Sequence, residues 1–284
     1  MDILVQTGWL ANSLGDDDLT ILDASAHLPG AGRDPAAEFA ASHIKGARFL
    51  GLPSLIDETS PVPAALPRAD QFEQRMRALG ISATDRIVLY DDSQLRSSAR
   101  AWFIFRMFGM KNVAILDGGF TQWRAAGLPV ETGTPKCAPT GFTVPQHDRS
   151  RVRGKAEILA NIASRAEQII DARDAARFSG DTGDTVHNLA GGHIPGALNL
   201  PFPRVLNDDG TFRRADDLRA AFETAGVDLS APVTGSCGSG MTASVLLFAL
   251  ELLGKRDTAL YDGSWSEWGA DPDTPKETGA SRTA

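Results

Sequence analysis

Residues 232–253 read PVTGSCGSGMTASVLLFALELL, a pattern that predicts a short strand, a tight loop and an apolar helix. Cys237 opens the loop, and Gly238 and Gly240 allow the backbone to curl so that several N–H groups converge on one point. The positive end of the following helix faces the same point and favours the thiolate form of a cysteine there. A free cysteine is often only a small buried apolar residue, but this glycine-rich turn indicates a reactive thiol.

The chain contains a second copy of this unit. Three motifs recur in the same order, namely residues 21–24 and 169–172, residues 43–47 and 193–197, and residues 117–123 and 262–268, the last pair at an offset of 145. Unrelated motifs that recur in one order indicate a tandem duplication, and a repeat this long is a domain rather than one turn of a solenoid. At the same offset Cys237 corresponds to Asp92, so the first copy is expected to lack the nucleophile.

Each copy alternates predicted strands with predicted helices. The strands are expected over residues 19–23, 87–90, 113–116, 169–171, 233–235 and 258–261. The helices are expected over residues 68–79, 97–108, 216–225 and 241–253. Such alternation predicts an α/β protein of two tandem domains, each a parallel sheet flanked by helices, with ligands bound outside the carboxyl ends of the strands.

Composition along the chain suggests the domain boundaries. Residues 1–130 form the predicted inactive domain, and residues 154–270 form the predicted catalytic domain. Between them, residues 131–153 contain prolines and glycines with weak periodicity, which is typical of a linker. The polar stretch 271–284 is expected to be a flexible tail.

Bulk composition excludes several classes of function. The chain has 284 residues, a formal net charge of −8 and no dense run of basic residues, which argues against nucleic-acid binding. The longest apolar run is too short to span a membrane, and the first residues lack a signal-peptide core. The five histidines and two cysteines show no metal-ligand spacing, and neither a metal nor a cofactor is expected.

The two cysteines, Cys137 and Cys237, predict a reducing environment. A disulfide between them would consume the candidate nucleophile, so the cytoplasm is the expected location. Cys137 lies in the predicted linker, where no helix N-terminus can activate it, and is expected to be incidental.

Together these features resemble a known family. Two tandem domains, an inactive first half and the loop Cys-Gly-Ser-Gly-x-Thr are similar to the tandem-domain rhodanese family, and within it to the 3-mercaptopyruvate sulfurtransferases. The resemblance runs from about Trp9 to Trp268 and includes residues 192–197 and 262–265. It implies that Cys237 takes a sulfane sulfur from 3-mercaptopyruvate as a persulfide, passes it to a thiol or to cyanide, and releases pyruvate. Thioredoxin is a common acceptor in that family.

The loop residues fit this chemistry independently of the resemblance. A negative persulfide can be held by N–H groups of the loop, which comprises Gly238, Ser239, Gly240, Met241 and Thr242 after the cysteine. Ser239 is expected to hydrogen-bond the leaving enolate, to shuttle a proton or to cap the loop. Thr242 is expected to begin the helix rather than to act in catalysis.

The donor carries a carboxylate, so a cation is expected to face Cys237. Arg177 matches the position of a substrate-binding arginine in similar enzymes, and its planar guanidinium suits a carboxylate. A second arginine of the family is replaced here by Val186. Its task is expected to fall to His187, as an imidazolium, or to Arg96 of the first domain.

His43 and Asp34 match residues that similar enzymes use with the loop serine as a proton relay. A histidine before Ile-x-Gly-Ala more often fixes a turn, and His193 occupies the same place in the second copy. Both a catalytic and a structural role therefore stay open for His43.

Three other functions compete with this one. A thiosulfate sulfurtransferase would bind a dianion, and the lack of charge in residues 238–243 argues against it. A cysteine phosphatase needs an arginine six residues after the cysteine, where this chain has Ala243. A persulfide carrier or redox sensor without turnover is the third alternative.

Overall fold

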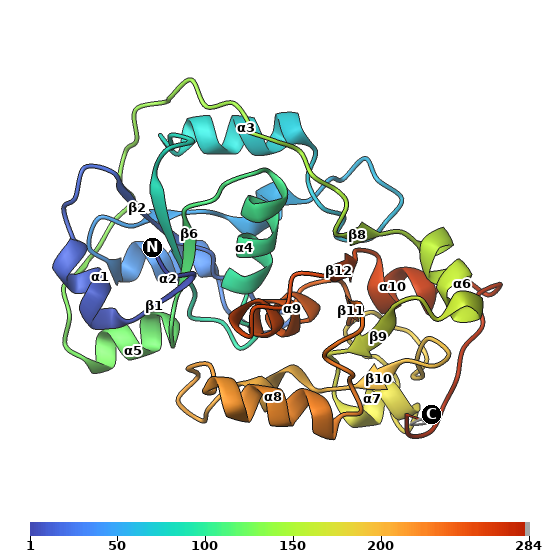
Figure 1. Cartoon of the computed structure of the whole chain (residues 1–284). Coiled ribbons are helices and arrows are strands. Elements are labelled where there is room, and N and C mark those ends of the chain that lie inside the picture. The colour runs from blue at the N-terminus through green and yellow to red at the C-terminus, as the bar shows by residue number, and fades with distance from the viewer. Residues whose placement is uncertain (282–284) are drawn as a thin grey trace. The chain divides into compact units, whose positions relative to one another are not determined.

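The structure is a computed structural model that describes residues 1–281. The chain forms two compact units (Figure 1). The first comprises residues 1–57, 66–148 and 208–211, and the second comprises residues 58–65, 149–207 and the described residues from 212 on. Each unit therefore includes a short segment from the other half of the chain.

The first unit is built on a five-stranded parallel sheet in the order β1-β6-β5-β2-β4. Its strands are β1 (Leu4–Val5), β2 (Leu19–Asp23), β4 (Arg48–Phe49), β5 (Arg86–Tyr90) and β6 (Val113–Leu116). Its helices are α1 (Thr7–Ser13), α2 (Pro35–Ala41), the 3-10 helix η1 (Leu52–Leu55), α3 (Ala69–Ala78), α4 (Ser98–Met107) and α5 (Gly119–Ala125). The short strands β3 (His43–Ile44) and β7 (Val130–Glu131) pair antiparallel outside the sheet.

The second unit repeats this plan with the order β10-β9-β11-β12-β8, again parallel. Its strands are β8 (Val152–Arg153), β9 (Gln168–Asp171), β10 (Leu198–Asn199), β11 (Val233–Ser236) and β12 (Thr258–Tyr261). Its helices are α6 (Lys155–Ser164), α7 (Ala175–Ser179), the 3-10 helix η2 (Phe202–Val205), α8 (Ala215–Thr224), α9 (Ala243–Leu252) and α10 (Ser264–Trp268). Two sheets with one topology confirm the predicted tandem α/β fold.

The central strands and one helix of each unit form the core. The residues of β6 and β12 are all buried, as expected for strands of a parallel sheet that is covered on both faces. In α9, residues 243–251 are all buried, because a helix that is apolar on every side is stable only inside the protein. This burial places the start of α9, and the loop before it, firmly against the sheet.

The strand register corrects the expected alignment of the two loops. Ile87 of β5 pairs with Val113 of β6, and Val233 of β11 pairs with Thr258 of β12. Val113 and Thr258 are 145 residues apart, but Ile87 and Val233 are 146 residues apart. The offset read from the sequence motifs therefore does not hold for β5 and β11.

Asp91, rather than Asp92, is consequently the counterpart of Cys237, and the alignment with Asp92 was wrong. The offset returns to 145 where α4 begins at Ser98 and α9 begins at Ala243. The loop between strand and helix is one residue longer in the first unit, and a constant offset cannot reveal such an insertion.

Segments outside the two sheets are anchored by hydrogen bonds. In the predicted linker, residues 131–153, Phe142 is buried and its carbonyl accepts a hydrogen bond from Arg77 at 2.6 Å. In the predicted tail, residues 271–284, the backbone of Glu277 exchanges two hydrogen bonds with His193, at 2.9 and 3.0 Å. The last three residues of that tail lie outside the described residues.

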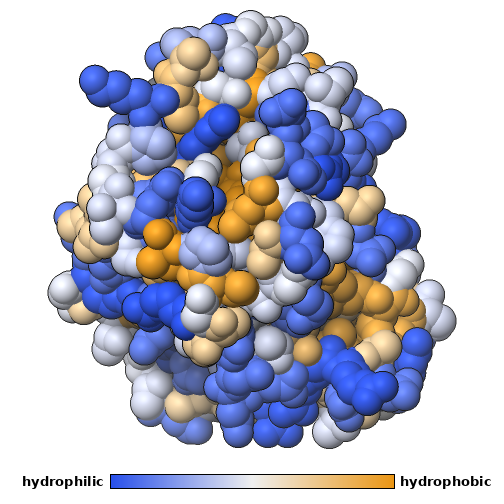
Figure 2. Space-filling view, turned by 90° about the vertical axis from the view of Figure 1, so that its left-hand side faces the viewer, coloured by the Kyte–Doolittle hydropathy of each residue, from blue (hydrophilic) through white to orange (hydrophobic). Residues whose placement is uncertain are grey.

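The face shown in Figure 2 is largely hydrophilic, and apolar side chains show mainly in hollows between polar ones. Within residues 1–281 no helix has both the length and the apolar character that a bilayer crossing requires.

Candidate active site

Cys237 stands at the carboxyl end of a central strand. β11 ends at Ser236 and lies between β9 and β12, so the next residue emerges at the edge where parallel sheets bind ligands. Cys237 is only 1 % exposed, whereas Ser239, Met241 and Thr242 are half-buried. Cys237 therefore lies deeper than these three residues of the loop.

Three carbonyl groups of the loop are occupied by hydrogen bonds from the protein. The donors are the Trp265 N–H to Cys237 at 2.9 Å, the Ser266 N–H to Gly238 at 2.8 Å, and the Ser244 Oγ to Gly240 at 2.8 Å. These bonds turn the acceptor groups of the loop toward α9 and α10.

Two N–H groups of the loop share one acceptor, the Ser264 hydroxyl. The N–H groups of Cys237 and Gly240 donate to Ser264 Oγ at 3.2 and 3.1 Å, and this hydroxyl donates to the Tyr261 carbonyl at 2.9 Å. Ser264 is buried and has a φ of 48°, a left-handed conformation that is strained for a residue other than glycine. Sequence reasoning missed Ser264, although it lies in the repeated motif of residues 262–268.

The other N–H groups of the loop are open. Those of Gly238, Ser239, Met241 and Thr242 donate to no residue within the described range 1–281. The Ser239 hydroxyl likewise has no partner in that range, and Thr242 stands at the N-cap of α9 without a side-chain cap bond. Open N–H groups at the start of a helix suit a bound anion.

The first unit closes the equivalent loop with a carboxylate. Asp91 accepts hydrogen bonds from the N–H of Ser93 at 2.9 Å and from the N–H of Ser98 at 3.0 Å. The side chain at the cysteine position therefore takes the N–H groups that an anion would need. This gives a physical reason for the expected inactivity of the first copy.

Arg177 and His187, both predicted to bind substrate, meet at one buried carboxylate, Asp184. Arg177 Nη1 lies 3.6 Å from Asp184 Oδ1, and the Arg177 Nε pairs with Asp174. The Nδ1 atom of His187 lies 3.0 Å from the same Asp184 Oδ1. Burial alone would raise the pKa of Asp184, but the hydrogen bond and charge of His187, with the charge of Arg177, lower it to about 2. Asp184 is thus ionised at neutral pH, and sequence reasoning did not find it.

His187 lies directly against the cysteine loop. A Cβ atom on Gly238 would overlap the imidazole ring, whose two nitrogens lie 3.1 Å from that position. Gly238 is therefore needed for this close approach rather than for an unusual backbone conformation. The His187 Nδ1 faces Asp184, and its Nε2 has no partner among residues 1–281. Val186, at the place of the missing family arginine, is 37 % exposed.

A second buried ion pair supports this cluster. Arg173 Nη2 lies 2.6 Å from Asp171 Oδ2, and the Arg173 guanidinium lies over the Trp265 ring, 4.5 Å from its centroid. Burial of a planar guanidinium against an indole and a carboxylate is a structural arrangement rather than a binding site. Arg173 also lies 3.9 Å from Asp184, through Nη1 and Oδ2.

Two predicted site residues of the first unit have local partners. Arg96 has a φ of 52°, and its guanidinium lies against Gly210 in the segment 208–211 of the same unit. Asp34 is the N-cap of α2, where its carboxylate accepts hydrogen bonds from the N–H groups of Ala36 at 2.9 Å and Ala37 at 3.1 Å.

His43, the other member of the predicted relay, is fully buried. Its Nδ1 lies 2.7 Å from the Phe39 carbonyl, its Nε2 lies 3.3 Å from Glu131, and its ring stacks on Phe39 at 3.9 Å. His193 repeats this environment, with Nδ1 2.9 Å from the Phe178 carbonyl and a ring distance of 3.8 Å. The same contacts in both copies favour a structural role for this histidine.

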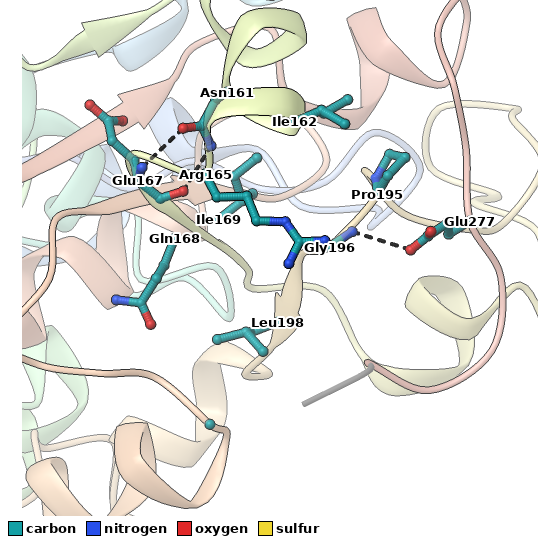
Figure 3. A pocket seen from close by; sticks show the side chains of 11 residues that line it. Asn161, Ile162, Arg165, Glu167, Gln168, Ile169, Pro195, Gly196, Leu198 and Glu277 are labelled. Carbon is teal, nitrogen blue, oxygen red and sulfur yellow. Dashed lines mark hydrogen bonds between the residues drawn. The ribbon is translucent and has the colours of Figure 1, made fainter. Parts of the chain in front are cut away.

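A hollow of about 600 Å³ lies at the opposite end of the second sheet (Figure 3). Its walls include Arg165, Ile169 at the start of β9, Leu198 and Glu277, and the Arg165 side chain extends across it toward Gly196. β9 and β11 run parallel, so this hollow is at their amino ends whereas Cys237 follows the carboxyl end. The hollow is therefore separate from the cysteine site.

The chain is similar to known proteins over nearly its whole length. The model of the rhodanese-like domain matches residues 6–126 and again residues 155–271. The chain is 40 % identical to the 3-mercaptopyruvate sulfurtransferase of Mus musculus, covering 93 % of this chain and 91 % of the relative. It is also 40 % identical to the 3-mercaptopyruvate sulfurtransferase of Escherichia coli K12, over 96 % of this chain and 97 % of the relative.

Two further relatives extend the comparison. The thiosulfate sulfurtransferase of Cricetulus griseus is 37 % identical, over 99 % of this chain and 97 % of the relative. The crystal structure of the Escherichia coli 3-mercaptopyruvate sulfotransferase SseA superposes with a TM-score of 0.85 at 37 % identity, over 93 % of this chain and 99 % of that chain.

Proposed function

The chain belongs to the rhodanese family of sulfurtransferases, and we propose that it transfers sulfur from 3-mercaptopyruvate through a persulfide on Cys237, releasing pyruvate. The observation that carries this proposal is the cysteine loop, in which the carbonyls of Cys237, Gly238 and Gly240 are occupied and four N–H groups after Cys237 are open. Such a loop suits a thiolate and the negative persulfide that replaces it.

The proposed reaction has two halves. The Cys237 thiolate attacks the sulfur of the donor, the carbon–sulfur bond breaks, and the departing electron pair forms the enolate of pyruvate. In the second half an acceptor thiolate, or cyanide, attacks the outer sulfur of the persulfide and regenerates the Cys237 thiolate. The open hydroxyl of Ser239 is available to hydrogen-bond the leaving enolate, which supports a role at the donor over a role as a loop cap.

Arg177 is the group that we propose for the donor carboxylate. It stands on α7 with a side chain that is 26 % exposed, and it shares Asp184 with His187, whose ring touches the cysteine loop. A guanidinium in this place can bind a carboxylate while Asp174 and Asp184 hold its other edges. His187 and Arg96 are the proposed replacements for the second family arginine, and contact with Gly238 supports His187.

Thiosulfate is the second candidate donor, since a thiosulfate sulfurtransferase is among the relatives of similar identity. The lack of charge in residues 238–243 supports 3-mercaptopyruvate instead, because a dianion gains more from cationic neighbours. Thioredoxin as acceptor, and a cytoplasmic location, stay predictions from the sequence. A persulfide carrier that does not turn over is the remaining alternative.

The test is a comparison of initial rates with 3-mercaptopyruvate and with thiosulfate, combined with intact-mass measurement after each donor. We expect pyruvate release, a higher kcat/KM for 3-mercaptopyruvate, and a mass gain of one sulfur atom. Cys237→Ser should lose both the activity and the mass gain, and Cys137→Ser is the matched control that should retain both. Full activity in Cys237→Ser would overturn the mechanism. If the wild-type protein gained one sulfur atom but did not turn over either donor, a persulfide carrier would be favoured.

A further inference from the structure

We propose that His187, oriented by Asp184, donates the proton that the departing enolate needs. The inference rests on the function proposed above, because a carbon leaving group must be protonated whereas sulfite, the leaving group of thiosulfate, need not be. It assigns to His187 a role beyond attraction of the donor carboxylate.

The hairpin that carries His187 is rigidly built. The N–H of Asp184 donates to the Leu189 carbonyl at 2.9 Å, and the N–H of Leu189 donates back to the Asp184 carbonyl at 3.1 Å. The Asp184 carboxylate, which is fully buried, then lies 3.0 Å from His187 Nδ1. A carboxylate on one ring nitrogen fixes the tautomer and the ring orientation, and this leaves Nε2 as the nitrogen that can exchange a proton.

This free nitrogen is at the reaction site. His187 Nε2 is 3.1 Å from the point where a Cβ of Gly238 would stand, and Gly238 follows the nucleophile directly. The proposal therefore places the leaving group of a donor whose sulfur meets Cys237 near this ring. A general acid has to lie within hydrogen-bond reach of the atom that it protonates. Apart from the chain neighbours of Gly238, the three atoms nearest its Cβ position all belong to His187.

Several charged groups surround the His187 ring. The groups that surround His187 and its partner Asp184 come from four places: Asp184 is on the same hairpin, and Arg177 and Asp174 belong to the region of α7. Asp171 ends β9 with Arg173 just after it, and Cys237 is on the loop. The three carboxylates and two guanidiniums sum to −1, and the Cys237 thiolate of the proposed reaction makes the sum −2. An imidazolium at His187, the acid form that the proposal requires, would lie among groups of net negative charge.

The proton balance of the step closes without an outside reagent. The thiolate and HS–CH2–CO–COO⁻ become Cys–S–SH and the pyruvate enolate, and the imidazolium of His187 gives its proton to that enolate. The persulfide S–H is more acidic than an ordinary thiol, and its proton then passes to the imidazole of His187. The net products are the persulfide anion and CH3–CO–COO⁻. With thiosulfate, the thiolate yields the persulfide anion and sulfite with no proton transferred.

The difference between the donors provides the experiment. His187→Asn keeps an amide that can hydrogen-bond Asp184 but removes Nε2. We expect kcat with 3-mercaptopyruvate to fall by about a hundredfold to ten-thousandfold, the usual contribution of a general acid. The ratio of wild-type kcat to variant kcat should be smaller at high pH than at low pH. Turnover with thiosulfate should fall by no more than about threefold, since steric effects of the change are small. His147→Asn, at an exposed histidine, is the matched control.

Each alternative outcome contradicts the inference in a different way. An equal loss with both donors would mean that His187 only supports the loop. A rise in KM for 3-mercaptopyruvate with unchanged kcat would mean that it only captures the carboxylate. If the wild-type protein turned over thiosulfate but not 3-mercaptopyruvate, both the proposed donor and this inference would be wrong. If the wild-type protein turned over 3-mercaptopyruvate and His187→Asn did so at the same rate, only this inference would be wrong.

Discussion

Trp265 donates its backbone N–H to the carbonyl of Cys237 at 2.9 Å, and thereby ties the nucleophile loop to the start of α10. The indole Nε1 of the same residue donates to the Ala190 carbonyl at 3.0 Å, just beyond the hairpin that carries His187. One buried residue therefore holds both halves of the candidate site, one through its backbone and the other through its side chain. The geometry of the site depends on α10 as much as on the loop itself, and the neighbouring Ser264 offers the sharpest test of that dependence.

Ser264→Ala should weaken both the fold and the activity. The change removes the acceptor of two buried N–H groups, those of Cys237 and Gly240, and a buried unsatisfied donor costs about 1–3 kcal/mol. Denaturant unfolding should show that loss, and kcat/KM should fall by roughly tenfold as the loop relaxes. Ser266→Ala is the matched control, because its buried hydroxyl donates to the Gly263 carbonyl and not to the loop. Similar activity losses in the two variants would refute a specific role for Ser264.

Arg177→Ala should raise KM for 3-mercaptopyruvate. One charge-assisted contact contributes about 1.5–3 kcal/mol, so kcat/KM should fall by roughly tenfold to a hundredfold. Arg177→Lys should restore only part of the affinity, because an ammonium cannot reproduce the two-point contact of a guanidinium. Steady-state kinetics with Arg165→Ala as control, an exposed arginine in the separate hollow, would check this. Unchanged kcat/KM in Arg177→Ala would place the carboxylate elsewhere.

Arg96→Ala tests whether the first unit supplies a charge for the donor. If it does, KM should rise by up to about tenfold with little change in melting temperature, as expected for one partly exposed charge contact. The Arg96 guanidinium lies against Gly210. Hydrogen bonds from Thr211 are the main cause that lowers the pKa of Asp209, and the charge of Arg96 makes a smaller contribution in the same direction. A lower melting temperature with unchanged KM would instead assign Arg96 to holding the segment 208–211.

Asp23→Asn should change stability in a pH-dependent way. Burial raises the pKa of Asp23 to about 6, and hydrogen bonds from Ser25 and Tyr90 offset only part of that effect. Because the folded pKa exceeds the ordinary value of 3.8, the wild-type protein loses stability as pH rises from about 4 to about 6, and the loss then stays constant. The free energy of unfolding of Asp23→Asn relative to wild type should therefore increase by about 3 kcal/mol from pH 4 to pH 7. A difference that does not vary with pH in urea unfolding would contradict the assignment.

The strong local patterns predicted the central elements well. β2, β6 and β12 have the expected bounds, and α3, α4, α8 and α9 lie within two residues of theirs or closer. The edge strands β1, β4, β8 and β10 contain two residues each, and so short a segment carries no periodicity that could be recognised. Their pairing arises only when the sheet is assembled.

The candidate site was predictable only in part. Cys237 could be recognised as the nucleophile because a cysteine, glycines and an apolar helix follow one another in the sequence. The features that activate a thiol in a tight turn come from residues that are neighbours in the chain. Asp184 and Ser264 carried no such signal, since an aspartate and a serine in loops are common and serve many purposes. Their importance follows from what they touch, namely His187 and the N–H groups of the loop.

The sequence by itself determined the duplication, the alternation of strands and helices and the nucleophile, because each depends on residues that are neighbours in the chain. Only the tertiary structure decided that Asp91 is the counterpart of Cys237 in the first unit, that Ser264 closes the loop, and that Arg177 and His187 share Asp184. These relations join residues that strand register and packing bring together, and a single inserted residue in a loop shifts them without changing any local pattern.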